Sequence, residues 1–398
     1  MILSRMLAAA MTTESSSTVV YTVFDRPDIG DQAVLVCLDF GDPDHQENVA
    51  ECVELVGSAN VTVTGIVQGK RQRPDAALFA GKGKVEEVGL MVRATGANVV
   101  IFNHQLSPGQ ERNLERALQC RVIDRTSLIL DIFAQRARSH EGKLQVELAQ
   151  LSHIATRLVR GWTHLERQKG GIGLRGPGES QLETDRRLLG NRVKALKERL
   201  AQVQKQRNTQ RRGRQRTGIA SVSIVGYTNA GKSTLFNALT KARSYAADQL
   251  FATLDTTSRK LFLNTETSII VSDTVGFIRD LPHTLVAAFR ATLEETIQAD
   301  LLLHVVDSSN PLRDVQIDEV NKVLAEIGAD GVPQLIVWNK TDLRQLPASI
   351  ERDQEQLAQA VRLSALTGEG LELLRTVLAE RLQSPDNQHE EQDEYVAE

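Results

Sequence analysis

A phosphate-binding loop is the clearest chemical pattern in the sequence. Gly226 to Ser233, with the sequence GYTNAGKS, fits the spacing G-x-x-x-x-G-K-[ST] and follows the apolar run Ser221 to Val225. Glycines let backbone N–H groups approach phosphate oxygens closely, and the helix expected from Thr234 directs its positive end at the same anion. We therefore predict that Lys232 contacts the β- and γ-phosphates of a nucleotide and that the Ser233 hydroxyl binds Mg²⁺.

A second motif, DTVG, spans Asp273 to Gly276 and follows the apolar run Ser268 to Ser272. A carboxylate at the end of that strand can hold the metal, commonly through a water molecule. The backbone N–H of Gly276 can sense the γ-phosphate. The motif therefore indicates the metal-binding side of the same nucleotide site.

Two further motifs indicate that the base is guanine. In NKTD, Asn339 to Asp342, the Asp342 carboxylate can accept hydrogen bonds from guanine N1–H and from its exocyclic amino group. Adenine lacks this pair of donors, so Asp342 would select guanine. The alkyl stem of Lys340 can lie along the base. In SAL, Ser364 to Leu366, a backbone N–H, with Ala365 as the best candidate, could donate to guanine O6.

The composition indicates an ordinary globular protein of two or three domains. Of its 398 residues, 41% are hydrophobic and 25% are charged, and no apolar stretch is long enough to span a bilayer. The three cysteines are scattered, which argues against a disulfide framework and for a reducing, cytoplasmic location. The eight histidines show no zinc-ligand spacing with these cysteines.

The net charge of −4 conceals a local basic block. Residues Arg157 to Arg216 hold 17 Lys and Arg against 5 Asp and Glu, whereas the rest of the chain is acidic. Such a block on an otherwise acidic protein favours a polyanionic partner on one face.

The N-terminal part of the chain alternates between expected strands and helices, which predicts a small α/β domain with a parallel sheet. The strands expected are Ala33 to Phe40, Val61 to Val67 and Val99 to Asn103, and the helices are Glu47 to Gly57, Lys84 to Thr95 and Pro108 to Gln119. The loop Asn103 to Gln110 is either a site or a polar helix cap. Gly81 to Lys84 could contact phosphate, although it lacks the full motif.

Two apolar seams in the basic block predict an antiparallel helical hairpin. The seams are Leu144, Leu148, Leu151, Ala155 and Leu158, and Leu182, Leu189, Val193, Leu196, Leu200 and Val203. The glycine-rich tip between them, Lys169 to Ser180, is either a plain connector or a loop that contacts RNA. The surrounding arginines (Arg157, Arg160, Arg167, Arg186, Arg187 and Arg192) favour RNA.

Several sequence motifs of this chain resemble those of the HflX family of GTPases, which is related to translation factors. The resemblance rests on the nucleotide motifs, on FATLD (Phe251 to Asp255) and, more specifically, on AGKGKVEE, FNHQLSPGQERNLE, DRTSLILDIFAQRA and GGIGLRGPGESQLETDRR, and it covers about residues 25 to 382. It implies a monomeric GTPase that binds GTP and Mg²⁺ and associates with the large (50S) ribosomal subunit and its rRNA. It also implies a role in ribosome splitting or rescue, protein synthesis or ribosome biogenesis. The alternative from a different class is a GTP- or ATP-dependent factor that remodels, or assists modification of, a non-ribosomal RNA.

The expected layout has five parts: a flexible tail (1–30), an N-terminal α/β domain (31–141), a basic helical hairpin with a glycine-rich tip (142–212), a Ras-like P-loop GTPase domain with a mixed, mostly parallel sheet (213–382) and an acidic disordered tail (383–398).

Through the resemblance, Thr253 is the switch threonine that closes onto Mg²⁺ and the γ-phosphate, with Ser233 as the other metal ligand. Thr256 and Thr257 are nearby alternatives to Thr253. Lys232, Thr253 and Gly276 are the expected catalytic residues. The expected nucleotide-binding residues are Gly226, Tyr227, Thr228, Asn229, Ala230, Gly231, Lys232, Ser233, Phe251, Ala252, Thr253, Leu254, Asp255, Asp273, Thr274, Val275, Gly276, Asn339, Lys340, Thr341, Asp342, Ser364, Ala365 and Leu366. The family usually has proline at position 256, where this chain has Thr256.

Two residues suggest how hydrolysis is controlled. Phe277 stands where related enzymes often have the glutamine that orients the attacking water, so we predict slow hydrolysis that a partner accelerates. Asn229 occupies a position that helps to hold potassium in related GTPases, so stimulation by K⁺ is a further hypothesis.

Overall fold

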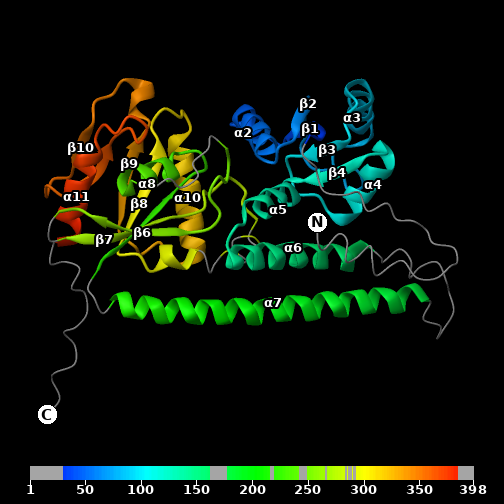
Figure 1. Ribbon diagram of the computed structural model, residues 1–398. Coiled ribbons are helices and arrows are strands. Elements are labelled where there is room, and N and C mark those ends of the chain that lie inside the picture. Colours follow the sequence, from blue (N-terminus) through cyan, green and yellow to red (C-terminus); the bar gives the residue numbers. More distant parts are fainter. Residues whose placement is uncertain are drawn as a thin grey trace, which may run out of the picture. The chain divides into compact units, whose positions relative to one another are not determined.

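The computed structural model describes residues 30–161, 177–215, 219–241, 249–264, 267–282, 285, 289 and 293–383. The chain divides into two compact units, one ending at Ile132 and one beginning at Phe133 (Figure 1). The domain boundaries expected from the sequence stay a prediction.

The N-terminal unit is built on a four-stranded, fully parallel sheet in the order β2-β1-β3-β4. Its elements are β1 Gln32–Asp39, α2 His45–Ser58, β2 Thr62–Lys70, α3 Lys82–Thr95, β3 Val99–Phe102, α4 Pro108–Leu118, β4 Arg121–Asp124 and α5 Arg125–Arg136, which ends just inside the second unit. Helices α3 and α4 share one apolar core with the sheet, around Val36, Phe102 and Leu114. The predicted α/β fold is confirmed, and β4 is a strand that the sequence analysis missed.

The loop before α4 is a helix cap. The Ser107 hydroxyl accepts a hydrogen bond from the Gln110 N–H at 3.3 Å, and the Gln110 side chain accepts one from the Ser107 N–H at 2.9 Å. This reciprocal capping box supports the interpretation of the loop as a polar cap. Nothing in its geometry requires a ligand.

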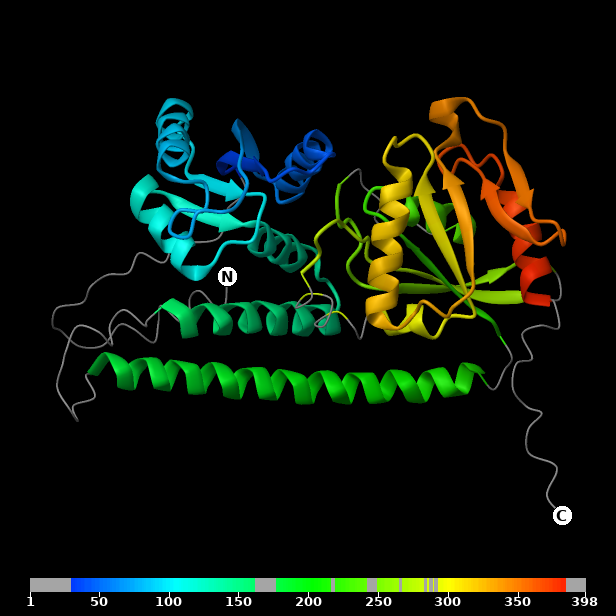
Figure 2. The ribbon, with the colours of Figure 1, turned by 180° about the vertical axis from the view of Figure 1, so that it is seen from behind.

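The predicted helical hairpin is formed by α6 His140–Gly161 and α7 Pro177–Gln215, which lie side by side (Figures 1 and 2). Leu144, Leu148 and Leu151 pack against Leu196, and an Arg192–Glu147 ion pair of 2.6 Å lies alongside. Pro177 to Ser180 are the first residues of α7, so the glycine-rich tip is shorter than expected. The rest of the tip, 169–176, lies outside the described residues.

The second unit also contains a seven-stranded sheet in the order β10-β11-β9-β8-β5-β7-β6, parallel except for the edge strands β10 and β6. Its elements are β5 Ser221–Gly226, α8 Lys232–Thr240, β6 Thr257–Phe262, β7 Ser268–Asp273, β8 Leu301–Asp307, α10 Arg313–Ile327, β9 Gln334–Asn339, the 3₁₀ turn η1 Thr341–Arg344, β10 Ser349–Arg352, β11 Ala358–Arg362 and α11 Leu371–Gln383. Helices α8 and α11 share one core with the sheet, and α10 lies on its other face (Figure 2). The predicted mixed sheet is confirmed, whereas β10 was not expected.

A buried histidine in this sheet makes the stability of the protein sensitive to acid. His304 on β8 is 1% exposed, and its Nδ1 lies 3.2 Å from Gln334 Oε1. Burial lowers the pKa of His304 to about 4, from an ordinary value of 6.5. The unfolded chain takes up this proton more readily than the folded chain. The stability that neutral His304 provides is therefore complete above pH 6.5 and is lost as the pH falls towards 4.

We expect the free energy of unfolding of the native protein to fall by about 3 kcal/mol more than that of His304→Asn between neutral pH and about pH 4, because the amide cannot take up a proton there. Denaturant unfolding of both proteins across this range measures the difference. Equal losses in the two proteins would contradict the assignment.

Candidate nucleotide-binding site

Four motifs meet at one edge of the seven-stranded sheet. The phosphate loop leaves β5, DTVG leaves β7, NKTD leaves β9 and SAL follows β11, and these four strands are parallel members of the same sheet. The carboxyl ends of parallel strands share an edge, so segments far apart in the sequence come together there. The sheet thus assembles the site that the sequence predicts.

Lys232 is a buried cation at the start of α8. Its side chain is 6% exposed, and its Nζ donates to the Tyr227 carbonyl oxygen at 2.5 Å. Burial lowers the pKa of Lys232 to about 8, against an opposing effect from Asp273. An anion placed against this ammonium group would favour its charged form, so the environment suits a phosphate.

A cluster of hard oxygen atoms lies beside the phosphate loop. Ser233 Oγ donates to Asp273 Oδ2 at 2.7 Å and lies 2.8 Å from Thr253 Oγ1. Asp273 is 1% exposed, its Oδ1 is a buried atom without a hydrogen-bond partner among the described residues, and burial raises its pKa. Two hydroxyls and an incompletely paired carboxylate are the donor set that Mg²⁺ accepts, so these residues fit the ion. No group of three or more His, Cys, Asp or Glu in the described ranges could hold a metal.

The DTVG loop lies directly against the phosphate loop. The Thr228 N–H donates to the Phe277 carbonyl at 2.7 Å, and the Phe277 N–H donates to the Gly226 carbonyl at 3.1 Å. A Cβ on Gly276 would come within 2.9 Å of Lys232 Nζ, so only glycine fits here without a shift. Phe277 is 1% exposed and packs inside the protein, where its ring offers no hydrogen bond to a water.

The Asn339 side chain connects the phosphate loop to the SAL segment through two hydrogen bonds. Its Nδ2 donates to the Ala230 carbonyl at 2.9 Å, and its Oδ1 accepts from the Ala365 N–H at 2.9 Å. A Cβ on Gly231 would lie 2.2 Å from the Asn339 amide nitrogen. In the structure, Asn339 Oδ1 therefore occupies the Ala365 N–H that was predicted to donate to guanine O6.

Asp342 has a buried carboxylate oxygen that could accept a hydrogen bond from a ligand. Its Oδ1 is a buried atom without a hydrogen-bond partner among the described residues, as is Thr341 Oγ1. Lys340, two residues before Asp342, has φ of +62° and forms an ion pair of 2.8 Å with Asp307. A buried carboxylate oxygen without a donor fits the donor edge of guanine.

The segment 249–255 contacts both the phosphate loop and residues 133–139. Thr253 points to Ser233, whereas the Phe251 ring packs edge-on against Phe133 with centroids 4.8 Å apart. Asp255 was predicted to bind nucleotide, but its carboxylate accepts from the backbone N–H groups of Arg138 and Ser139. Sequence reasoning missed both of these partners.

The remaining predicted residues line the loops or support them. Asn229, Ala252 and Gly231 are partly exposed around the phosphate loop; Thr274 Oγ1 donates to the Ile224 carbonyl at 2.6 Å; Ser364 Oγ accepts from the Thr367 N–H at 3.2 Å; Leu254 and Val275 are buried; and Leu366 is exposed.

Comparison with known proteins identifies the family. Three family models match, described as GTP-binding GTPase N-terminal (residues 46–134), GTP-binding GTPase Middle Region (136–214) and 50S ribosome-binding GTPase (221–340). The chain is 58% identical to GTPase HflX of Escherichia coli K12 over 368 residues, which covers 92% of this chain and 86% of that protein. It belongs to the HflX family of GTPases.

Further similarities agree with this assignment. GTPase HflX of Caldanaerobacter subterraneus is 51% identical over 81% of this chain and 76% of its own length. A crystal structure described as the complex of SsGBP and GDP is 26% identical, with a TM-score of 0.50, and the match covers 88% of this chain and 98% of that chain. The resemblance found in the motifs is confirmed, and the HflX-family chain is a GTP hydrolase.

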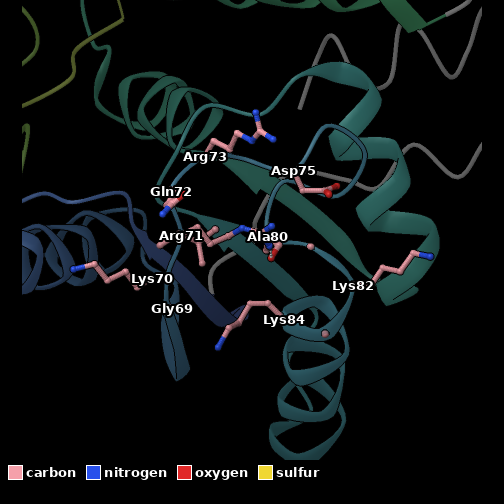
Figure 3. Close-up of a pocket in the computed structure, with 12 residues that line it drawn as sticks. Gly69, Lys70, Arg71, Gln72, Arg73, Asp75, Ala80, Lys82 and Lys84 are labelled. Atoms are coloured by element: carbon pink, nitrogen blue, oxygen red, sulfur yellow. Dashed lines mark hydrogen bonds between the residues drawn. The ribbon is translucent and has the colours of Figure 1, made fainter.

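A cavity in the N-terminal unit of this HflX-family GTPase is lined by several basic side chains (Figure 3). It has a volume of about 720 Å³ and is lined by Lys70, Arg71, Arg73, Lys82 and Lys84 among others. Arg71 donates to the Ala80 carbonyl, and Lys84 Nζ donates to the Gln68 carbonyl at 2.8 Å. Two of the five cations therefore already bind backbone carbonyls of the protein itself. Contact of Gly81 to Lys84 with phosphate stays a prediction. No described helix is long and apolar enough to cross a membrane.

Proposed function

We propose that this HflX-family GTPase binds the large (50S) ribosomal subunit and its rRNA, and acts in ribosome splitting or rescue, protein synthesis or ribosome biogenesis. The observation that carries this proposal is the match of residues 221–340 to the family model described as 50S ribosome-binding GTPase. The activity takes place in the cytoplasm, and the protein acts as a monomer.

The hairpin supports an RNA partner. Helix α7 carries a series of exposed basic side chains: Arg186, Arg187, Lys194, Lys197, Arg199 and Lys205. Glu198 is an exposed acidic residue within this series. A long helix with a strong excess of positive charge suits the closely spaced phosphates of rRNA, and binding through it should weaken as salt rises.

The nucleotide site supports hydrolysis of GTP. Ser233 and Thr253 would hold Mg²⁺ directly, with Asp273 holding it through water, and the ion would supply charge stabilisation at the phosphates. Lys232 neutralises the β- and γ-phosphates, the Gly276 N–H contacts the γ-phosphate, and Asp342 selects guanine. Closure of Thr253 and Gly276 onto GTP forms one of two states, and this state sets the affinity for the ribosome.

Sedimentation with purified ribosomal subunits tests the proposal. The protein should travel with the large subunit most strongly with a non-hydrolysable GTP analogue. Lys194→Glu with Lys197→Glu should reduce that binding, whereas Lys241→Glu with Lys322→Glu, which changes two exposed lysines elsewhere, should not. Failure of the native protein to sediment with the large subunit in any nucleotide state would overturn the proposal.

Potassium should accelerate hydrolysis if Asn229 helps to hold this ion. Asn229 lies in the phosphate loop with φ of +59° and lines the same cavity as Lys232 and Ser233. A cation there would stabilise the negative charge that develops during phosphoryl transfer. GTP turnover in matched potassium and sodium buffers gives the answer, and equal rates would remove potassium from the mechanism.

A further inference from the structure

We propose that Asp255 is a positioning residue for GTP hydrolysis, which holds the Thr253 segment closed by binding Arg138 and Ser139, the two residues that directly precede α6. The inference rests on the proposed role of Thr253 at the γ-phosphate and Mg²⁺. It adds a link between the nucleotide site and the helical hairpin.

The contact consists of three hydrogen bonds to one carboxylate. Asp255 Oδ2 accepts from the backbone N–H groups of Arg138 and Ser139, each at 2.8 Å, and Oδ1 accepts from the Ser139 hydroxyl. Ser139 Oγ in turn accepts from the Gly142 N–H at 2.8 Å, which caps α6. A negative charge at the N-terminus of a 22-residue helix is also favoured by the helix dipole.

The lack of a side chain at Gly142, in the first turn of α6, also supports the contact. A Cβ on Gly142 would lie 2.1 Å from Asp255 Oδ1 and 3.1 Å from Ser139 Oγ. A residue other than glycine at this position would therefore displace the carboxylate. Within a helix, glycine is otherwise a poor choice, by about 1 kcal/mol relative to alanine. Glycine at position 142 leaves room for the Asp255 carboxylate.

The same segment holds Thr253 on its other side. Thr253 lies two residues before Asp255, and its hydroxyl contacts the Ser233 hydroxyl. Strand β6 starts two residues after Asp255, and its first residue, Thr257, pairs with Asp273. Phe251, packed on Phe133, forms the other support of the segment. Thr253 is thus placed between two attachments to residues 133–142, and release of either leaves its hydroxyl free to leave the site.

This arrangement makes the coupling reciprocal. If the closed position of Thr253 favours the contact between Asp255 and α6, then a partner that fixes the first turn of α6 favours the closed position of Thr253 by the same factor. The bound nucleotide can therefore change how firmly the start of the hairpin is held. Conversely, a partner bound to the hairpin can promote hydrolysis without placing any of its own residues in the nucleotide site.

The test uses Gly142→Ala in the full-length protein, because this variant blocks the contact while Asp255, Thr253 and all phosphate-binding groups stay unchanged. Single-turnover GTP hydrolysis should fall about tenfold, the range that loss of a helix cap supports. Binding of a GTP analogue should weaken by a similar factor, whereas binding of GDP should not change, because GDP lacks the phosphate that Thr253 senses. Asp255→Ala should behave in the same way.

Gly190→Ala is the matched control. Gly190 also lies inside a helix, α7, and a Cβ there meets nothing within 4 Å, so this variant should hydrolyse GTP as the native protein does. Hydrogen exchange adds a readout that a merely structural role would not move. The Arg138 and Ser139 amides should be protected more with the GTP analogue than with GDP, and Gly142→Ala should abolish that difference.

Thr253→Ala separates the two ideas. Loss of hydrolysis in Thr253→Ala with native hydrolysis in Gly142→Ala would overturn the role of Asp255 and leave the proposed site intact. Native hydrolysis in Thr253→Ala would overturn the proposed site itself.

Discussion

Replacement of Asp342 by asparagine should weaken GTP binding by at least about 10²-fold and allow a xanthine nucleotide to bind in its place. Asp342 Oδ1 is buried and lacks a hydrogen-bond partner among the described residues, so it is available to the guanine N1–H and amino donors. An asparagine side chain has an NH₂ group that can donate to the oxygen that xanthine carries in place of the amino group, and a carbonyl oxygen that can accept from N1–H. Titration of fluorescent guanosine and xanthosine nucleotides measures both effects.

Asp330→Asn is the control for this change, because Asp330 is an exposed residue that follows α10. It should bind GTP as the native protein does. An Asp342→Asn protein that keeps its affinity for GTP would show that another group reads the base.

Replacement of Lys232 by methionine should reduce GTP binding by about 10²-fold or more, because a charged donor to phosphate is lost from a buried position. The same change should leave the nucleotide-free protein at least as stable as the native one. Burial already lowers the pKa of Lys232 to about 8, which shows that the site disfavours the charge in the absence of an anion. Nucleotide titration and thermal unfolding without nucleotide provide the two measurements.

Lys322→Met, at an exposed lysine on α10, is the matched control and should change neither quantity. If Lys232→Met unfolded the nucleotide-free protein, the lysine would be a structural residue, and its assignment to phosphate binding would lose its support.

The local parts of the site could be predicted from the sequence. Glycine spacing, a lysine and a hydroxyl in one loop define a phosphate site because all these groups act within a few residues of each other. The apolar runs before GYTNAGKS and DTVG placed these two motifs at strand ends, and strands β5 and β7 confirm this. The apolar seams likewise predicted the pairing of α6 with α7.

Contacts between distant segments could not be predicted. Asn339 braces a loop 109 residues away, and Asp255 bonds to Ser139 at a separation of 116 residues, so no local pattern contains either partner. Ser139 does carry a local signal, since a serine before a helical pattern is a common N-cap. Strand β3 has only four residues, but all four are apolar. Strands β4 (RVID) and β10 (SIER) are equally short and contain charged residues, so neither shows an apolar run that would predict a strand.

Hydrolysis of GTP with and without purified large subunits tests the central claim most directly. Phe277 is buried and offers no hydrogen bond to the attacking water, so the isolated protein should turn over slowly. Large subunits that order Thr253 and Gly276 should raise the single-turnover rate by at least about tenfold, whereas small subunits should not. A rapid rate in the isolated protein, or one that large subunits leave unchanged, would contradict the account.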